Sequence, residues 1–353
     1  RMMQTLVGRD GFARGMTRYF ERHDGQAVTV DDFASAIADA NPSSELARTL
    51  PSFGRWYSQA GTPRLSARGT WDADSGRYTL ELSQQGEPSP GQPTKAPWVV
   101  PVMVGLVGRS GQALPLHLDG EEGDAAAGDA RTERLLVLES ESARWTFTGL
   151  TQAPVPSLLR GFSAPVRLDD GLSDSDLLVL LAHDPDAFNR WEAGQRLMTR
   201  RLLAAAHRAE PSTVLGDDLI EGLKGVLHHA HLAPALKELA LTLPSEVYLA
   251  EQCEVVDPER LHAVREAALD ELATRLGADW AETFASHQVL GSYSPDPDSA
   301  GRRALASLAL AMLCRQGLLN GDAVWPGRAY QRVKDSSNTV SYTHLTLPTI
   351  LRV

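Results

Sequence analysis

The hydrophobic periodicity of this sequence changes twice along the chain, and this feature constrains the fold most. Up to about residue 61, and again from Ser173 onward, apolar residues recur every three or four positions, as on one face of an α-helix. Between these segments apolar and polar residues alternate, as in Tyr78, Leu80 and Leu82, which is typical of a half-buried strand. The sequence therefore predicts helices, then a run of strands, then helices again.

Local signals place the first helices. A stripe ending at Phe20 predicts one helix that stops at Asp24-Gly25, where the chemistry favours a turn. Thr29 and Asp32 resemble a capping box and predict the start of the next helix. A third helix is expected to carry Phe53, Trp56 and Tyr57.

The central segment is expected to form an antiparallel sandwich, because its strands are short and separated by turns. A longer strand over residues 98–107 contains Pro101, which predicts an edge strand or a bulge. Further strands are expected over residues 114–118, 134–139, 144–148 and 158–162. The acidic segment 119–129 is interpreted as a solvated hairpin loop, since it lacks the ligand spacing of a known calcium loop.

The last segment carries clear helix starts. Ser173 is a good N-cap, and Asp184-Pro185 and Asp257-Pro258 each place a capping acid before a proline. Three apolar stripes follow, over residues 188–202, 261–276 and 302–315. Helix pairs joined by short loops favour an α-helical superhelix, although no exact repeat is present.

Composition excludes several classes of function. Lys and Arg number 34 against 45 Asp and Glu, so the formal net charge is −11 and nucleic acid is not an expected partner. No apolar run reaches the roughly 18 residues that span a bilayer, so no membrane association is expected. Two cysteines form no disulfide scaffold, and they fit a reducing, cytoplasmic location.

A motif search finds no catalytic centre. There is no His-Glu-x-x-His, Gly-x-Ser-x-Gly, P-loop, dinucleotide fingerprint or Cys-x-x-Cys. His228, His229 and His231 cluster without a carboxylate at the matching spacing, so they are interpreted as a helix end. His207 and Glu210 are interpreted as a solvated face.

Two other groups are interpreted as structural. Cys253 and Cys314 lie among apolar neighbours and are expected to be inert buried thiols. An aromatic group is expected to be core rather than a binding platform, because its spacing is helical: Tyr19, Phe20, Trp56 and Tyr57. The predicted sets of catalytic, cofactor-binding and metal-binding residues are therefore all empty.

Four stretches of the sequence resemble one family of enzymes. They cover residues 19–33 (YFERHDGQAVTVDDF), 55–63 (RWYSQAGTP), 152–166 (QAPVPSLLRGFSAPV) and 183–193 (HDPDAFNRWEA). In this order they resemble the bacterial zinc aminopeptidases of the aminopeptidase N (alanyl aminopeptidase) family, over about residues 1 to 338.

The resemblance implies a domain order that matches the changes of period. Residues 1–63 would be the helical C-terminal part of a thermolysin-like catalytic domain, and residues 64–168 an Ig-like antiparallel β-sandwich. Residues 169–338 would be an incomplete α-helical superhelix. Residues 339–353 (TVSYTHLTLPTILRV) depart from the family and resemble translated adapter read-through, so a non-native tail is expected there.

The resemblance also implies a function. The family removes N-terminal residues from peptides with a free N-terminus, using a zinc ion held by two His and a Glu, with a second Glu as general base. A Gly-x-Met-Glu-Asn loop holds the substrate amine and a Tyr stabilises the oxyanion. None of these maps onto a residue here, and the chain opens on Arg1.

We therefore expect a fragment of such an enzyme that binds no zinc and is inactive alone. The alternative is a non-enzymatic adaptor whose sandwich and superhelix bind a protein partner.

Overall fold

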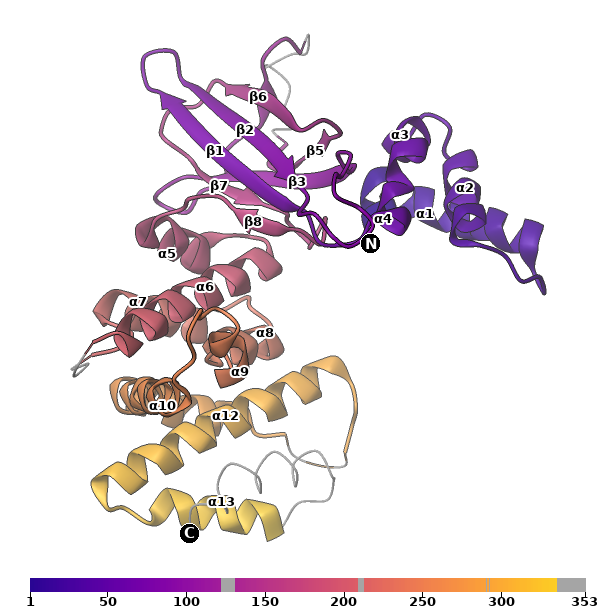
Figure 1. Cartoon of the computed structure of the whole chain (residues 1–353). Coiled ribbons are helices and arrows are strands. Elements are labelled where there is room, and N and C mark those ends of the chain that lie inside the picture. Colours follow the sequence, from indigo (N-terminus) through magenta and orange to yellow (C-terminus); the bar gives the residue numbers. More distant parts are fainter. Residues whose placement is uncertain (122–130, 209–212, 290, 292, 335–353) are drawn as a thin grey trace. The chain divides into compact units, whose positions relative to one another are not determined.

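A computed structural model describes residues 1–121, 131–208, 213–289, 291 and 293–334 (Figure 1). The chain divides into two compact units, Arg1–Asn189 and Arg190–Val353, and each is described by itself. Among the described helices, none combines the length and the apolar character needed to cross a membrane.

The first unit opens with helices, as the periodicity predicts. They are α1 (Met2–His23), α2 (Val30–Asp39), α3 (Glu45–Phe53) and α4 (Arg55–Ser58). The capping box is confirmed, because the Thr29 side chain accepts from the Asp32 backbone while Asp32 accepts from that of Thr29. The single third helix expected from the sequence is instead divided at Gly54, a weak helix former, into α3 and α4.

The sandwich has two sheets. Its strands are β1 (Arg64–Asp72), β2 (Arg77–Gln85), β3 (Val100–Val107), β4 (His117–Leu118), β5 (Arg134–Leu138), β6 (Ser142–Thr148), β7 (Val155–Leu158) and β8 (Arg167–Asp169). One sheet has the order β4-β6-β2-β1-β8 and the other the order β5-β3-β7. All pairings are antiparallel except that of β1 with β8, which is parallel.

Pro101 does not mark the edge strand that was expected, but it lies in a part of β3 that has only one neighbouring strand. β3 is the central strand of its sheet, not an edge. However, β7 pairs only from Val104 onward, so β5 is the one partner strand at Pro101. The N–H of Met103 points away from β5, to Ser163 Oγ, so the nitrogen of Pro101 two residues earlier also faces away from β5 and its missing N–H costs no ladder hydrogen bond.

The strand expected over residues 158–162 is also wrong. β7 ends at Leu158, and positive φ angles at Leu159 (59°), Gly161 (62°) and Phe162 (55°) turn the chain. The strand expected over residues 114–118 shortens to β4. β1 and β8 were not expected at all.

Both faces of the β5-β3-β7 sheet are covered. Leu136 and Leu138 of β5 lie in the core between the two sheets, with Trp98, Leu80 and Phe147. The alternate residues Leu135 and Val137 pack instead against a second cluster formed by α1, α2 and α3. That second cluster is centred on Ile37, Leu46, Phe53 and Val99, all at most 1% exposed.

The remaining helices follow in sequence. They are α5 (Asp174–His183), α6 (Ala187–Ala206), α7 (Asp217–His228), α8 (Pro234–Leu241), α9 (Glu246–Ala250), α10 (Pro258–Arg275), α11 (Gly277–Ser286), α12 (Pro297–Asn320) and α13 (Val324–Lys334). Ser173 caps α5, and Asp257 caps α10 ahead of Pro258, as expected.

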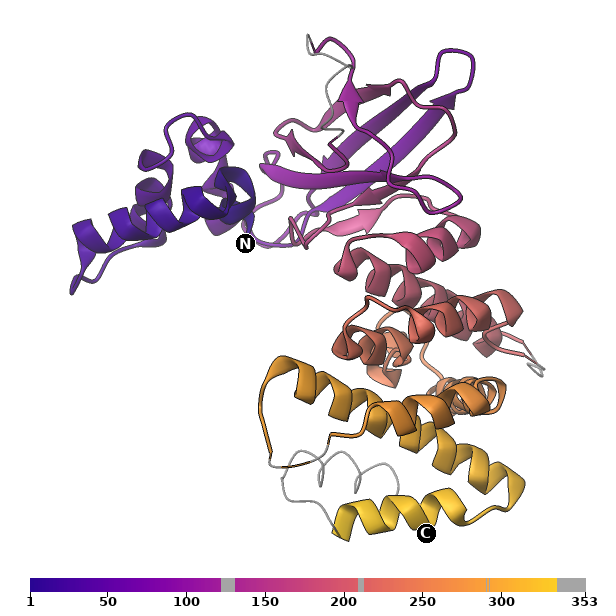
Figure 2. The same ribbon diagram turned by 180° about the vertical axis from the view of Figure 1, so that it is seen from behind.

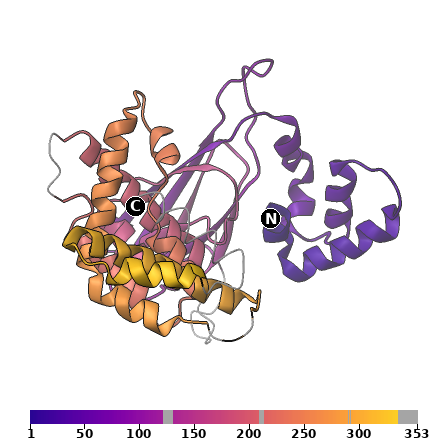
Figure 3. The same ribbon diagram turned by 90° about the horizontal axis from the view of Figure 1, so that it is seen from below.

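In the second unit, α12 packs against α8, α10, α11 and α13. Figures 2 and 3 show the ribbon from behind and from below, with α13 in yellow beside α12. The stripe expected over residues 261–276 is buried on α10 and at its C-cap.

Candidate functional site

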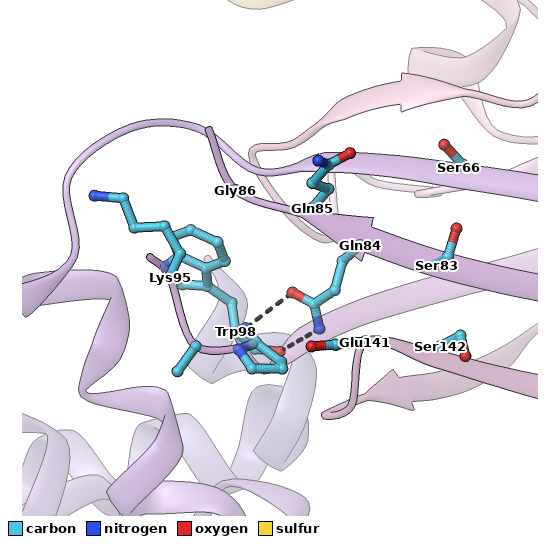
Figure 4. Close-up of a pocket in the computed structure, with 11 residues that line it drawn as sticks. Ser66, Ser83, Gln84, Gln85, Gly86, Lys95, Trp98, Glu141 and Ser142 are labelled. Atoms are coloured by element: carbon cyan, nitrogen blue, oxygen red, sulfur yellow. Dashed lines mark hydrogen bonds between the residues drawn. The ribbon is translucent and has the colours of Figure 1, made fainter. Parts of the chain in front are cut away.

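A polar pocket of about 510 Å³ lies at the end of the five-stranded sheet where β1 and β6 begin and β2 ends (Figure 4). Its floor includes Ser66 of β1, Ser83 of β2 and Ser142 of β6. These three serines are direct cross-strand partners, so they form a row across three adjacent strands. Gln85 and Glu141 also line the pocket beside these serines, and the five residues together form its polar wall.

The opposite wall comes from residues 86–98, the Pro/Gly-rich segment between β2 and β3. Lys95, Ala96, Pro97 and Trp98 line the pocket, and Trp98 is only 2% exposed. Its indole N–H is buried and has no acceptor among the described residues. Buried donors are normally satisfied, so this wall lacks one hydrogen bond.

Glutamine side chains hold this wall in place. Gln84 accepts from the backbone N–H of Trp98 (2.9 Å) and donates to the carbonyls of Trp98 (2.8 Å) and Ser140 (2.9 Å). Figure 4 shows the paired bonds between Gln84 and Trp98. The Gln84 amide thus bonds both the N–H and the carbonyl of Trp98, as the backbone of a neighbouring strand would.

Two more reciprocal amide–backbone pairs join residues 86–98 to residues 58–60, at the end of α4. Gln59 donates to the carbonyl of Ala96 (2.9 Å) and accepts from its N–H (2.8 Å). Gln92 donates to the carbonyl of Ser58 (2.8 Å) and accepts from the N–H of Ala60 (2.8 Å). The pocket wall is therefore fixed by reciprocal amide–backbone pairs, which make it a preformed cavity.

A second polar group of unit 1 is fully buried. The Arg160 guanidinium, 1% exposed, lies 3.1 Å from the Asp184 carboxylate, which is 0% exposed. Arg160 also donates to Ser157 Oγ (2.8 Å) and pairs with Glu133 (3.2 Å). Burial is the main influence on Asp184 and raises the pKa of its carboxyl, against the opposing effect of Arg160.

The role expected for Asp184 is therefore wrong. α6 begins at Ala187, and it is Asp186 that accepts from the N–H of Asn189 (2.9 Å) at the first turn. Asn189 in turn donates to Ser157 Oγ and to the Leu158 carbonyl, both at 2.8 Å. Two of the stretches that carried the resemblance, 152–166 and 183–193, thus bind each other.

The histidines form a different arrangement from the one expected. His228 ends α7, and its Nε2 lies 2.7 Å from Oδ1 of Asp279 on α11. This carboxylate was not predictable from sequence spacing, because it is 51 residues away. His231 lies beyond the helix end, and its ring meets that of His229 edge-on with centroids 6.2 Å apart.

The cysteines and the aromatic group correspond only partly to the expectations. Both cysteines are free; Cys314 is buried, which raises the pKa of its thiol to about 11, whereas Cys253 is half-buried. The expected core position is wrong for Phe20 and Tyr57, which are 55% and 47% exposed. The remaining two are half-buried: the Tyr19 ring meets Phe33, and the Trp56 indole donates to Val99.

Three expectations fall on residues that the structure does not describe. Glu210 of the His207–Glu210 pair lies outside the described residues, as do most of the acidic segment 119–129 and the whole of the expected tail 339–353. Within the described part of the chain, no three His, Cys, Asp or Glu side chains converge as metal donors. The described residues therefore do not fit a zinc ion.

Two family models match the chain. One describes a domain of unknown function with an Ig-like fold, over residues 61–171, and the other a domain of unknown function with ARM repeats, over residues 174–348. These matches define the class: a chain that joins an Ig-like domain to a helical-repeat domain. This confirms the fold class expected from the sequence.

Relatives of known name match most of the chain. Aminopeptidase N of Escherichia coli is 34% identical over 315 residues, which are 89% of this chain and 34% of the relative. Aminopeptidase N of Caulobacter vibrioides is 37% identical, covering 86% and 33%, and that of Haemophilus influenzae is 32% identical, covering 91% and 35%.

A crystal structure of Legionella pneumophila aminopeptidase A in complex with aspartic acid shares the fold. Its TM-score is 0.79 at 24% identity, covering 98% of this chain and 37% of that one. The chain belongs to the aminopeptidase N family, and it spans about a third of the length of the curated relatives that it matches.

Proposed function

We propose that this chain is the supporting part of a zinc-dependent aminopeptidase that removes N-terminal residues from peptides with a free N-terminus. The observation that carries the proposal is the match to relatives named aminopeptidase N over about nine-tenths of the chain. We prefer it to the adaptor alternative, because the three relatives compared above are all named as aminopeptidases.

We assign the zinc and the peptide-bond chemistry to a part of the enzyme outside residues 1–353. The described residues offer no set of three metal donors, so no catalytic or metal-binding residue is proposed within them. The four-part division at residues 63, 168 and 338 and the cytoplasmic location also stay predictions. The family match that runs to residue 348 extends into the proposed tail.

A chimera tests this proposal. This chain replaces the matching third of the Caulobacter vibrioides aminopeptidase N, and the hydrolysis of an alanyl anilide is measured. We expect turnover by the chimera and none by that relative when the third is deleted. A folded chimera that binds zinc but does not turn over would contradict the proposal.

The chain alone supplies a second readout. Metal analysis after dialysis should find far less than one zinc per chain, with no hydrolysis of the anilide. Stoichiometric zinc together with turnover would show that the metal site lies in this chain and that our assignment is wrong.

A further inference from the structure

The polar pocket of the sandwich has many hydrogen-bonding groups with no partner. Within the described part of the chain, the side chains of Ser66, Ser83, Gln85, Glu141 and Ser142 have no hydrogen-bond partner. Each hydroxyl can both donate and accept, and the Gln85 amide adds two donors and an acceptor. One wall of the pocket is therefore free to bind a ligand with several hydroxyl or amide groups.

The charges lining the pocket argue against an anionic ligand. The only cationic side chain among the lining residues is Lys95, and its ammonium already donates to Ser89 Oγ (2.6 Å) and to Gln92. Glu141 adds a carboxylate to the same wall. A phosphate or a carboxylate would therefore meet a negative charge without a free cation to offset it.

The facing wall is largely apolar. It consists of Ala96, the Pro97 ring, Trp98 and the stem of Lys95. A ligand that suits both walls has apolar C–H groups on one side and hydroxyls on the other. This is the chemistry of a sugar ring, and the glutamine pairs hold the cavity ready for it, which lowers the entropic cost of binding.

We propose that this pocket binds a neutral saccharide of one or two rings. The row of Ser66, Ser83 and Ser142 bonds the sugar hydroxyls, while Pro97 and the Lys95 stem cover its C–H face. Adjacent strands place successive serines about 4.8 Å apart, so one ring can reach two of them. This inference does not depend on the proposed function.

Ligand-observed saturation-transfer NMR on the full chain tests the proposal. The probes are glucose, N-acetylglucosamine, maltose and cellobiose, with trialanine as the competing class of ligand. We expect transfer to at least one saccharide. Ser83→Ala and Ser142→Ala should each weaken its binding by about two- to ten-fold, the usual loss for one hydrogen bond.

Thr79→Ala is the matched control. Thr79 also carries a hydroxyl on β2, four residues before Ser83, but it bonds Thr146 and does not line the pocket. This variant should bind the saccharide as the unchanged chain does, and circular dichroism confirms that all three variants fold. No transfer to any saccharide, equal binding in the Ser83 and Thr79 variants, or transfer to trialanine alone would each overturn the proposal.

Discussion

Arg160 and Asp184 hold opposite charges that are almost completely withdrawn from water. A buried charge is tolerated only while its partner is present, because desolvation costs several kcal/mol per ion. The two residues differ in which interactions remain for one when the other is replaced. Without Asp184, the guanidinium keeps Glu133 and Ser157, whereas without Arg160 the carboxylate loses the guanidinium that lies 3.1 Å away.

Arg160→Met should therefore destabilise unit 1 by roughly 3–5 kcal/mol, and Asp184→Asn by clearly less. Because burial raises the pKa of Asp184, its neutral replacement removes part of an existing penalty. Hydrogen exchange of the β7 amides measures both changes. Equal losses in the two variants would show that Arg160 contributes through packing rather than charge.

Cys314 gives a prediction about pH. Burial raises the pKa of its thiol from 9.0 to about 11, so the folded state disfavours the thiolate. The contribution of the protonated thiol is fully present below pH 9 and is lost as the pH rises toward 11. Unfolding curves of the chain and of Cys314→Ala at pH 8, 9, 10 and 11 should show stability falling more steeply in the unchanged chain.

The half-buried Cys253 serves as the internal comparison. Cys253→Ala controls for the loss of a cysteine side chain as such, since Cys253 is only half-buried. Identical slopes in the chain and in Cys314→Ala would contradict the assignment.

Local sequence was a good guide to residues whose partners are close by. The caps at Thr29, Ser173 and Asp257 were predictable because each bonds a backbone group three residues away. Asp184 and His228 were not, because Arg160 and Asp279 come from distant segments. A charge pair formed by tertiary packing leaves no local signal in the sequence.

At the scale of elements, the contact between α1 and α2 depends on a residue without a side chain. A Cβ on Gly15 would lie 2.5 Å from Cδ1 and 2.9 Å from Cα of Ile37, which is fully buried. The backbone of Ile37 cannot rotate away as a flexible side chain would. The two helices therefore lie closer than any larger residue permits.

Gly15→Ala should lower the free energy of unfolding of unit 1 by about 1–3 kcal/mol, the usual cost of overpacking. Gly225→Ala is the control, since Gly225 also lies inside a helix but has no atom within 4 Å of the added methyl. That control should stabilise α7 by about 0.5–1 kcal/mol through helix propensity. Denaturant unfolding monitored by exchange in α2 and α7 separates the two.

The strands show which elements the sequence could not reveal. β2, β5 and β6 were predictable from alternation or short apolar runs. β1 was not, because only Leu65 and Ala67 are buried before Gly69 interrupts the pattern, and β8 has three residues. Positive φ angles in the turn after β7 fall on Leu159 and Phe162, residue types that do not signal a turn.

At the scale of whole units, unit 1 contains two apolar clusters that are covered to different extents. The sandwich core is enclosed by two sheets, while the cluster of α1–α3 rests on one sheet. The far end of α1 has little cover, since Phe20 is 55% exposed and Phe33 is only half-buried. We expect local opening to begin there.

Hydrogen exchange should therefore be fastest in α1 beyond Phe12 and in α2, intermediate in α3, and slowest in β2 and β3. Ile37 and Phe53 are both buried, but only α3 and α4 continue into the segment that Gln59 and Gln92 tie to the sandwich. Protection of residues 12–23 equal to that of β2 would contradict this order.

The glutamine pairs have a consequence for how the pocket could change during evolution. The reciprocal pairs that Gln84, Gln59 and Gln92 make with the backbone end on main-chain N–H and carbonyl groups, which all residues except proline provide in full. The side chain at position 96 could therefore be exchanged without moving the wall. The shape of the cavity would be inherited while its selectivity diverged, so a single scaffold could accept a succession of different ligands.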